Sequence, residues 1–118
     1  MKKSLHILAD FYNCRGNLKY LASRKPTEPK LKAIAKKAGF HVLGTLFHEF
    51  PGGGITGLIL VSESHIAIHT WPERGYLTLD VFFCNYTRNN TIKVRQALQD
   101  LRAIYKPSKI VKREILRD

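Results

Sequence analysis

Residues 55–83, ITGLILVSESHIAIHTWPERGYLTLDVFF, hold three apolar runs separated by two short polar connections. The runs at 55–61, 65–71 and 76–83 have the length and the β-branched and aromatic content of strands. Connections this short join antiparallel neighbours, because a parallel pair needs a crossover of a dozen or more residues. The stretch therefore predicts three consecutive antiparallel strands, and the nearly continuous apolar run of the first one predicts burial on both of its faces.

The flanking segments complete the sheet and supply helices. We interpret residues 13–30 as a polar connection and residues 1–118 as a single domain. The apolar pattern predicts further strands over 4–12, 41–50 and 109–116 and amphipathic helices over 29–38 and 91–106. This order of elements favours an α+β fold, a two-layer α/β sandwich whose mainly antiparallel sheet is covered by two helices. With so small a core, we expect dimerisation through the uncovered edge or face of the sheet.

The composition excludes several classes of protein. Apolar residues make up 44% and charged residues 25% of the chain, which is typical of a globular protein and not of a disordered or collagen-like one. No apolar run approaches the 18 or more residues of a membrane-spanning helix, and no signal-peptide pattern follows the basic N-terminus. We therefore expect a cytoplasmic protein with no membrane partner. The two cysteines, Cys14 and Cys84, are too few for a disulfide framework.

The net charge of +11 is unevenly distributed along the chain. Such a balance is typical of nucleic-acid binders, which gather cations at the binding surface. Residues 38–87, however, contain one basic residue, Arg74, against four acidic ones, so this segment has a net charge of −3. We therefore expect no nucleic-acid partner, and we expect the middle segment to receive a cationic ligand.

Reactive side chains concentrate where the second of the three strands begins. Ser64 stands at the junction of two predicted strands, between Glu63 and His65. His65 and His69 share one face of the strand because side chains alternate along it. A structural interpretation makes the serine a turn residue and the histidines half-buried hydrogen-bonding groups.

Two catalytic interpretations compete with this structural one. A metal site would use His65, His69 and Cys84, but no CxxC pair or close third ligand supports it. A hydrolase would use Ser64, His69 and Asp80, but the chain lacks the GxSxG turn of that architecture. The residues alone leave these interpretations open.

A longer block of sequence resembles a known family. The block SESHIAIHTWPE, with FHEF and GITG upstream and DVFFC downstream, closely resembles the prokaryotic S-adenosylmethionine decarboxylases, small pyruvoyl-dependent enzymes of polyamine biosynthesis. The motifs cover the chain from Leu5 to about Cys84, and length and helix placement extend the resemblance over the rest. The resemblance implies a carboxy-lyase that converts S-adenosylmethionine to decarboxylated S-adenosylmethionine, the aminopropyl donor for spermidine.

The resemblance also implies a proenzyme that cleaves itself between Glu63 and Ser64. In the family, the serine hydroxyl attacks the preceding carbonyl, an N→O acyl shift gives an ester, and β-elimination splits the chain. Ser64 would then become the covalent pyruvoyl cofactor, and no metal is implied. His69 matches the processing histidine of the family, and Thr56 matches a position where serine is usual.

Three further residues match positions that act on the substrate. Cys84 matches the general acid that reprotonates the substrate carbon after the pyruvoyl Schiff base loses carbon dioxide. Phe50 matches an aromatic ring that stacks on adenine, and Glu73 matches a carboxylate that binds the ribose hydroxyls. The structural alternatives for these three are strand packing, core packing and a solvated turn, and Trp71 is expected to shape that turn.

In the small bacterial enzymes of this family, the active site is shared across a two-fold homodimer. One subunit would give the pyruvoyl group and Cys84, and its partner would give Phe50, Thr56, His69 and Glu73. The acidic middle segment would then line a cleft for the sulfonium cation of the substrate.

Two alternatives remain for the activity. The loop after Phe50 reads Pro-Gly-Gly-Gly, where family members usually carry a bulkier residue before the last glycine, and some members decarboxylate L-ornithine or L-arginine instead. The second alternative is an unprocessed, non-enzymatic homologue that binds its ligand. Phe50 and Glu73 favour the nucleoside substrate, and the intact Ser64, His69 and Cys84 favour an enzyme.

Overall fold

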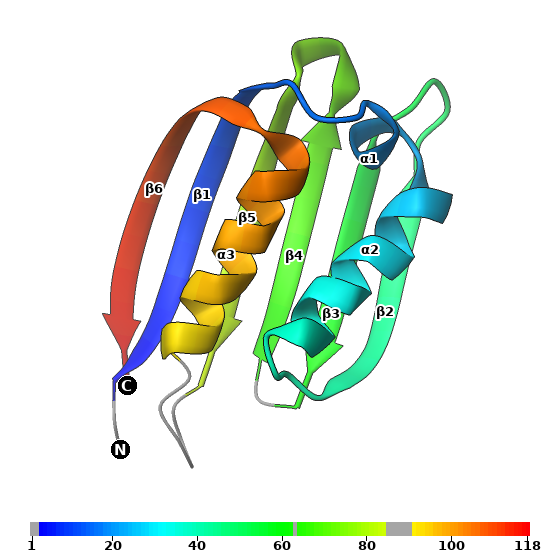
Figure 1. The fold of residues 1–118 in the computed structure, drawn as a ribbon. Coiled ribbons are helices and arrows are strands. Elements are labelled where there is room, and N and C mark those ends of the chain that lie inside the picture. Colours follow the sequence, from blue (N-terminus) through cyan, green and yellow to red (C-terminus); the bar gives the residue numbers. More distant parts are fainter. Residues whose placement is uncertain (1–2, 63, 85–90) are drawn as a thin grey trace.

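The chain folds into two layers, a six-stranded sheet and helices packed on one of its faces (Figure 1). The computed structural model describes residues 3–62, 64–84 and 91–118. Its strands are β1 (Ser4–Cys14), β2 (Val42–Glu49), β3 (Ile55–Val61), β4 (Ser64–Trp71), β5 (Tyr76–Phe83) and β6 (Pro107–Arg117). Its helices are α1 (Lys19–Ala22), α2 (Arg24–Lys37) and α3 (Thr91–Tyr105), with a 3-10 turn, η1 (Pro72–Arg74).

The sheet runs in the order β2-β3-β4-β5-β1-β6, and each neighbouring pair is antiparallel. Short connections join β2 through β5 into a meander, as the sequence predicts. The longer segments through α2 and α3 place β1 and β6 at the other side of the sheet (Figure 1). The predicted α+β two-layer sandwich is confirmed.

Helix α2 begins earlier than the sequence pattern predicts. We expected the segment to be a connection until Pro29, whereas the helix starts at Arg24 and a further short helix, α1, precedes it. Pro26 lies in the first turn, where its missing N–H leaves no helical bond unmade. Thr27 stabilises the same turn by donating its hydroxyl to the Ser23 carbonyl at 2.6 Å. Proline was therefore a poor marker of this helix start.

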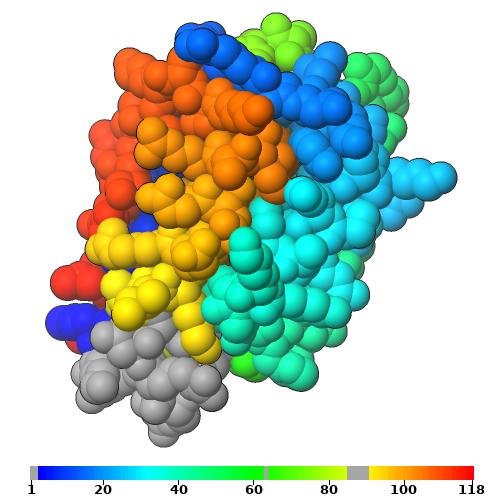
Figure 2. All heavy atoms as spheres, viewed as in Figure 1, coloured from blue at the N-terminus to red at the C-terminus, as the bar shows by residue number. Residues whose placement is uncertain are grey.

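The core lies between the sheet and the two longer helices. The atoms of α2 and α3 meet and hide most of the central strands from this side (Figure 2). Alternate strand residues point into this layer and are almost fully buried, because successive side chains of a strand leave opposite faces. The largest fully buried side chains are Ile7, Phe11, Leu31, Ile55, Ile59, Ile66, Ile68, Leu77, Val81, Phe83, Leu101 and Tyr105.

The opposite face of the sheet carries apolar side chains that no described residue covers. On β3, Leu58 and Leu60 are 38% and 47% exposed, so the prediction that this strand is buried on both faces is wrong for a single copy of the chain. Leu46 on β2 is 75% exposed, and Leu8 on β1 is 37% exposed. We call this surface the open face. Within the described residues, no helix has the length and hydropathy to cross a membrane.

Candidate active site

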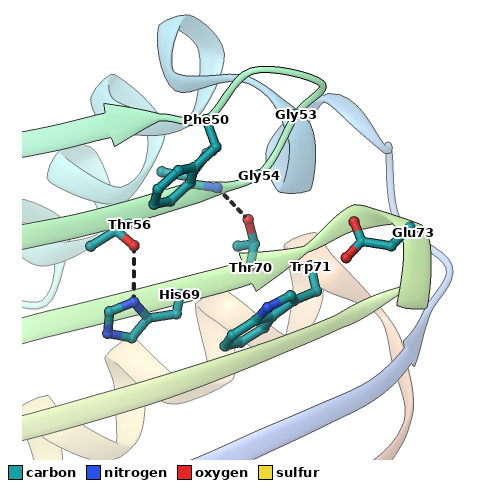
Figure 3. A pocket seen from close by; sticks show the side chains of 9 residues that line it. Phe50, Gly53, Gly54, Thr56, His69, Thr70, Trp71 and Glu73 are labelled. Carbon is teal, nitrogen blue, oxygen red and sulfur yellow. Dashed lines mark hydrogen bonds between the residues drawn. The ribbon is translucent and has the colours of Figure 1, made fainter.

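A pocket lies at one end of the sheet, where the β2–β3 connection, the start of β3 and the end of β4 meet (Figure 3). Its volume is about 320 Å³. The lining residues are Phe50, Gly53, Gly54, Ile55, Thr56, His69, Thr70, Trp71 and Glu73. Four candidates from three sequence motifs thus line one pocket: Phe50, Thr56, His69 and Glu73.

Thr56 and His69 face each other across β3 and β4. They are register partners in the antiparallel pair, and Thr56 Oγ1 lies 3.0 Å from His69 Nδ1. A threonine hydroxyl can donate or accept, so the tautomer of the imidazole decides which of the two groups donates. The contact therefore orients an exposed histidine ring at the edge of the pocket.

The glycines of the β2–β3 connection have backbone angles that other residues rarely adopt. The φ angle is +84° at Gly52, +104° at Gly53 and +105° at Gly54. The chain folds back so that the Phe50 N–H donates to the Gly54 carbonyl at 2.9 Å and the Gly53 N–H donates to the Phe50 carbonyl at 3.0 Å. The tight loop projects the Phe50 ring, 46% exposed, along the pocket (Figure 3).

Thr70 joins three elements beneath the pocket, and the sequence analysis missed it. Its buried hydroxyl donates to the Leu21 carbonyl at 2.6 Å and accepts from the Ile55 N–H at 2.8 Å. These bonds tie β4 to α1 and to the start of β3. The available signal was a threonine in a place where the alternation of the strand calls for an apolar residue.

Aromatic rings and a carboxylate border the pocket. His48 meets Phe50 edge to face with ring centroids 4.7 Å apart. Trp71, expected only to shape the turn, lines the pocket, and its ring lies 5.3 Å from that of Tyr76. Glu73 stands exposed on η1 at the rim (Figure 3). Such a lining suits a flat aromatic ligand that also carries hydroxyl groups or a positive charge.

Ser64 is the first residue of β4, and its backbone pairs with Val61 on β3 and Phe83 on β5. Its side-chain oxygen is buried and has no hydrogen-bond partner among the described residues. A buried hydroxyl without a partner is uncommon in native proteins and points to a functional role. Glu63, the other residue of the expected cleavage bond, lies outside the described residues.

Cys84 directly follows Phe83, the register partner of Ser64, so it lies at the Ser64 end of the sheet. His69 lies five residues further along β4, a distance of roughly 17 Å at the rise of a strand. One copy of the chain therefore holds Ser64 and Cys84 at one end and the pocket at the other. Cys14 lies elsewhere, and burial raises the pKa of its thiol to about 11, which disfavours a reactive thiolate.

The two competing catalytic sets are not assembled within the described residues. The metal-ligating group found there is His6, His65 and Asp80, and it includes neither His69 nor Cys84. The Asp80 carboxylate bonds His6 and His65, whereas His69 bonds the threonine opposite it. Neither the alternative metal set nor the alternative hydrolase set is brought together in the described part of the chain.

Comparisons with known proteins agree with this geometry. A sequence model of the S-adenosylmethionine decarboxylase family matches residues 5–118. A crystal structure of the adenosylmethionine decarboxylase from Aquifex aeolicus VF5 superposes with a TM-score of 0.87 and 30% identity, over 98% of this chain and 91% of that one.

Several curated relatives carry the name S-adenosylmethionine decarboxylase proenzyme. The one from Carboxydothermus hydrogenoformans is 34% identical over 94% of this chain and 86% of its own length. The one from Syntrophomonas wolfei is 44% identical over 67% of this chain, and the match spans 61% of that relative's own length. The chain belongs to the S-adenosylmethionine decarboxylase family.

Proposed function

We propose that the chain is a pyruvoyl-dependent S-adenosylmethionine decarboxylase that activates itself by cleavage between Glu63 and Ser64. The observation that carries the proposal is the pocket in which Phe50, Thr56, His69 and Glu73 come together. The family and the names of the relatives support the same activity. The product would be decarboxylated S-adenosylmethionine, for spermidine synthesis.

Self-cleavage would begin at the buried Ser64 hydroxyl. Its Oγ attacks the carbonyl carbon of residue 63, the C–N bond breaks, and an ester forms while the serine amine is released. Removal of the Ser64 Cα proton then breaks the Cβ–O bond, so that residue 63 leaves as a carboxylate. The remaining enamine becomes an imine, and water replaces its nitrogen, which is lost as ammonia. A hydroxyl that gives up no hydrogen bond on reacting is suited to the first step.

The residues around Ser64 fit a pyruvoyl group at that position. Once formed, the group supplies an electron sink for the loss of the substrate carboxylate. Cys84, next to the register partner of Ser64, would hold the thiol proton that the product carbon receives. At the other end, the Phe50 ring would lie against adenine and the sulfonium, and the Glu73 carboxylate would accept bonds from the ribose hydroxyls.

We further propose that the enzyme is a homodimer with shared sites. Ser64 and Cys84 lie too far from His69 in one copy for all three to touch one small substrate. A two-fold arrangement of open face on open face would bring the Ser64 end of one copy to the pocket of the other. The exposed Leu58 and Leu60 on that face support this packing, because a second copy would bury them.

The proposed substrate is tested by carbon dioxide release from S-adenosylmethionine, L-ornithine and L-arginine. We expect release from S-adenosylmethionine, and none from a Ser64→Ala control. Release from an amino acid alone would overturn the nucleoside substrate and favour the ornithine or arginine alternative. Binding of S-adenosylmethionine without any release would favour the non-enzymatic homologue.

A further inference from the structure

Three side chains from neighbouring strands converge on the open face near the Ser64 end of β4. His6 on β1 and His65 on β4 place their Nε2 atoms 2.5 and 3.1 Å from one oxygen of Asp80 on β5. Their side chains are 15%, 35% and 39% exposed for His6, His65 and Asp80, so the cluster is partly shielded from water. The proposed chemistry described above uses none of the three.

Arg117 determines which ring nitrogen of His6 carries the hydrogen. Its Nη1 lies 3.3 Å from His6 Nδ1, and its Cζ lies 5.0 Å from the centre of the Phe82 ring. A guanidinium only donates, so His6 Nδ1 accepts from Arg117, and the Nε2–H of His6 donates a hydrogen bond to Asp80. A protonated Nε2 offers no lone pair to a metal ion, and the nearby guanidinium repels a cation. In this arrangement the cluster is a hydrogen-bond network that anchors His65.

The anchored residue is the one that follows Ser64. The Ser64 hydroxyl is buried, and no described residue holds it by a hydrogen bond. The direction of that hydroxyl therefore depends on the position of the backbone at Ser64, the first residue of β4. The next residue, His65, is paired through its backbone to β3 and β5, and its side chain is tied to Asp80.

We propose that Asp80 is a positioning residue for the self-cleavage of the chain, acting through His65. The proposal rests on the proposed function, because it assigns a role within the cleavage step. The carboxylate binds an imidazole on either side, so it ties the start of β4 to β1 across β5. When the first residues of β4 are held in place, the Ser64 hydroxyl has fewer orientations open to it. A larger fraction of them is then suitable for attack on the preceding carbonyl.

The test is the rate of self-cleavage in freshly translated chains, followed by denaturing mass spectrometry. Asp80→Ala removes both bonds, and we expect cleavage to slow by at least about tenfold, the effect of losing a charge-assisted hydrogen bond. Asp80→Asn keeps the acceptor oxygen, and we expect the rate to recover to within about threefold of the wild type.

A second variant separates this role from another one. Asp80 also lines a hollow of about 260 Å³ together with His69, so its loss has more than one consequence. His65→Phe breaks the same contact while it fills the volume of the ring, and we expect it to slow cleavage as Asp80→Ala does. If Asp80→Ala does not fold, the comparison of His65→Phe with Asp80→Asn decides the question.

Controls distinguish a failure of the positioning role from a failure of the proposed function and from a loss of folding. Glu114→Gln changes a carboxylate on β6 that binds Lys112 of the same strand and Arg95 of α3. We expect its rate of cleavage to be unchanged. Thermal unfolding of each variant, measured in the uncleaved Ser64→Ala background, is expected to shift by only a few degrees. An uncut wild type would overturn the proposed function. Cleavage of Asp80→Ala and His65→Phe at the wild-type rate, in a wild type that cleaves, would overturn the positioning role alone.

Discussion

Two buried hydroxyl groups on β4 differ in their hydrogen bonding. The Ser64 hydroxyl is buried without a partner among the described residues, whereas the Thr70 hydroxyl both donates and accepts at 2.6 and 2.8 Å. A satisfied buried hydroxyl stabilises a fold, whereas an unsatisfied one costs stability and is a candidate for a functional role. This contrast separates the residue that we assign to chemistry from the residue that we assign to structure.

Substitution of Ser64 and of Cys84 should separate cleavage from turnover. Ser64→Ala lacks the nucleophile, so we expect it to remain at full length and to release no carbon dioxide. Cys84→Ala keeps the nucleophile but lacks the proposed proton donor, so we expect it to cleave and to turn over at least about 100-fold more slowly. Gel electrophoresis and carbon dioxide release measure the two properties. A cleaved Ser64→Ala protein would mean that ordinary proteolysis cuts the chain.

Substitution of Thr70 should affect stability more than chemistry. Thr70→Val has nearly the same shape but leaves the Leu21 carbonyl and the Ile55 N–H without their partner. We expect the free energy of unfolding to fall by about 1–3 kcal/mol, measured by urea denaturation. Thr78→Val, at a half-buried position of β5, is the matched control and should change it by less than about 0.5 kcal/mol. An equal effect of both variants would contradict the role given to the Thr70 hydroxyl.

At the scale of the elements, an exposed pair of charged side chains adds to the apolar contact between the sheet and helix α3. Arg95 on α3 binds Glu114 on β6 through two bonds of 2.8 and 3.1 Å, and Lys112 lies 3.0 Å from the same carboxylate. The Arg95 and Lys112 hydrogen bonds lower the pKa of Glu114 below its ordinary value. Because the pair is exposed to solvent, its contribution to stability stays below about 1 kcal/mol.

This contribution should depend on pH in one direction. A carboxyl whose pKa is lowered in the folded state stabilises it at neutral pH and loses that effect as the pH falls through the folded pKa. We expect Glu114→Gln to be less stable than the wild type at pH 7 and equally stable well below about pH 4. Urea denaturation at several pH values measures this. A difference that does not change with pH would show that the ion pair contributes nothing.

The sequence predicted the strands of the meander better than it predicted the start of α2 or the exposure of the strand faces. The meander from β3 to β5 followed from the alternation of apolar residues and from the short connections, which are local properties. The start of α2 was missed because Pro26 is accepted in the first turn without loss of a bond, and because Pro29, the predicted start, lies inside the helix. The exposure of Leu58 and Leu60 was missed because an apolar strand has the same pattern whether its second face meets a helix, another copy or water.

The candidate site was predictable only through motifs. The family motifs hold four pocket residues at fixed places in the sequence and so predict them: Phe50, Thr56, His69 and Glu73. Thr70 and the Asp80 network were missed, since hydrogen bonds across strands depend on register. No local pattern around Asp80 predicts that His6 lies two strands away from His65 and bonds the same carboxylate.

At the scale of the whole molecule, Ser64 and the pocket lie at opposite ends of the sheet, and this separation is our reason for proposing a second copy. If the sites are shared, a chain that lacks Ser64 and a chain that lacks the pocket residue Phe50 can complement each other. We expect co-expressed Ser64→Ala and Phe50→Ala chains to recover roughly a quarter of the wild-type activity, since half of random dimers carry one intact site. Either variant alone should be nearly inactive. Absence of any recovery in dimers of both chains would contradict shared sites.

The central claim is self-cleavage at Ser64, and denaturing intact-mass spectrometry of the purified chain tests it most directly. We expect two fragments, residues 1–63 and 64–118, of roughly 7 and 6 kDa by proportional length. Their summed mass should exceed that of the uncut chain by about 1 Da, because the pyruvoyl group replaces NH by O. A single uncut mass, or a sum about 18 Da higher from simple hydrolysis, would contradict the claim.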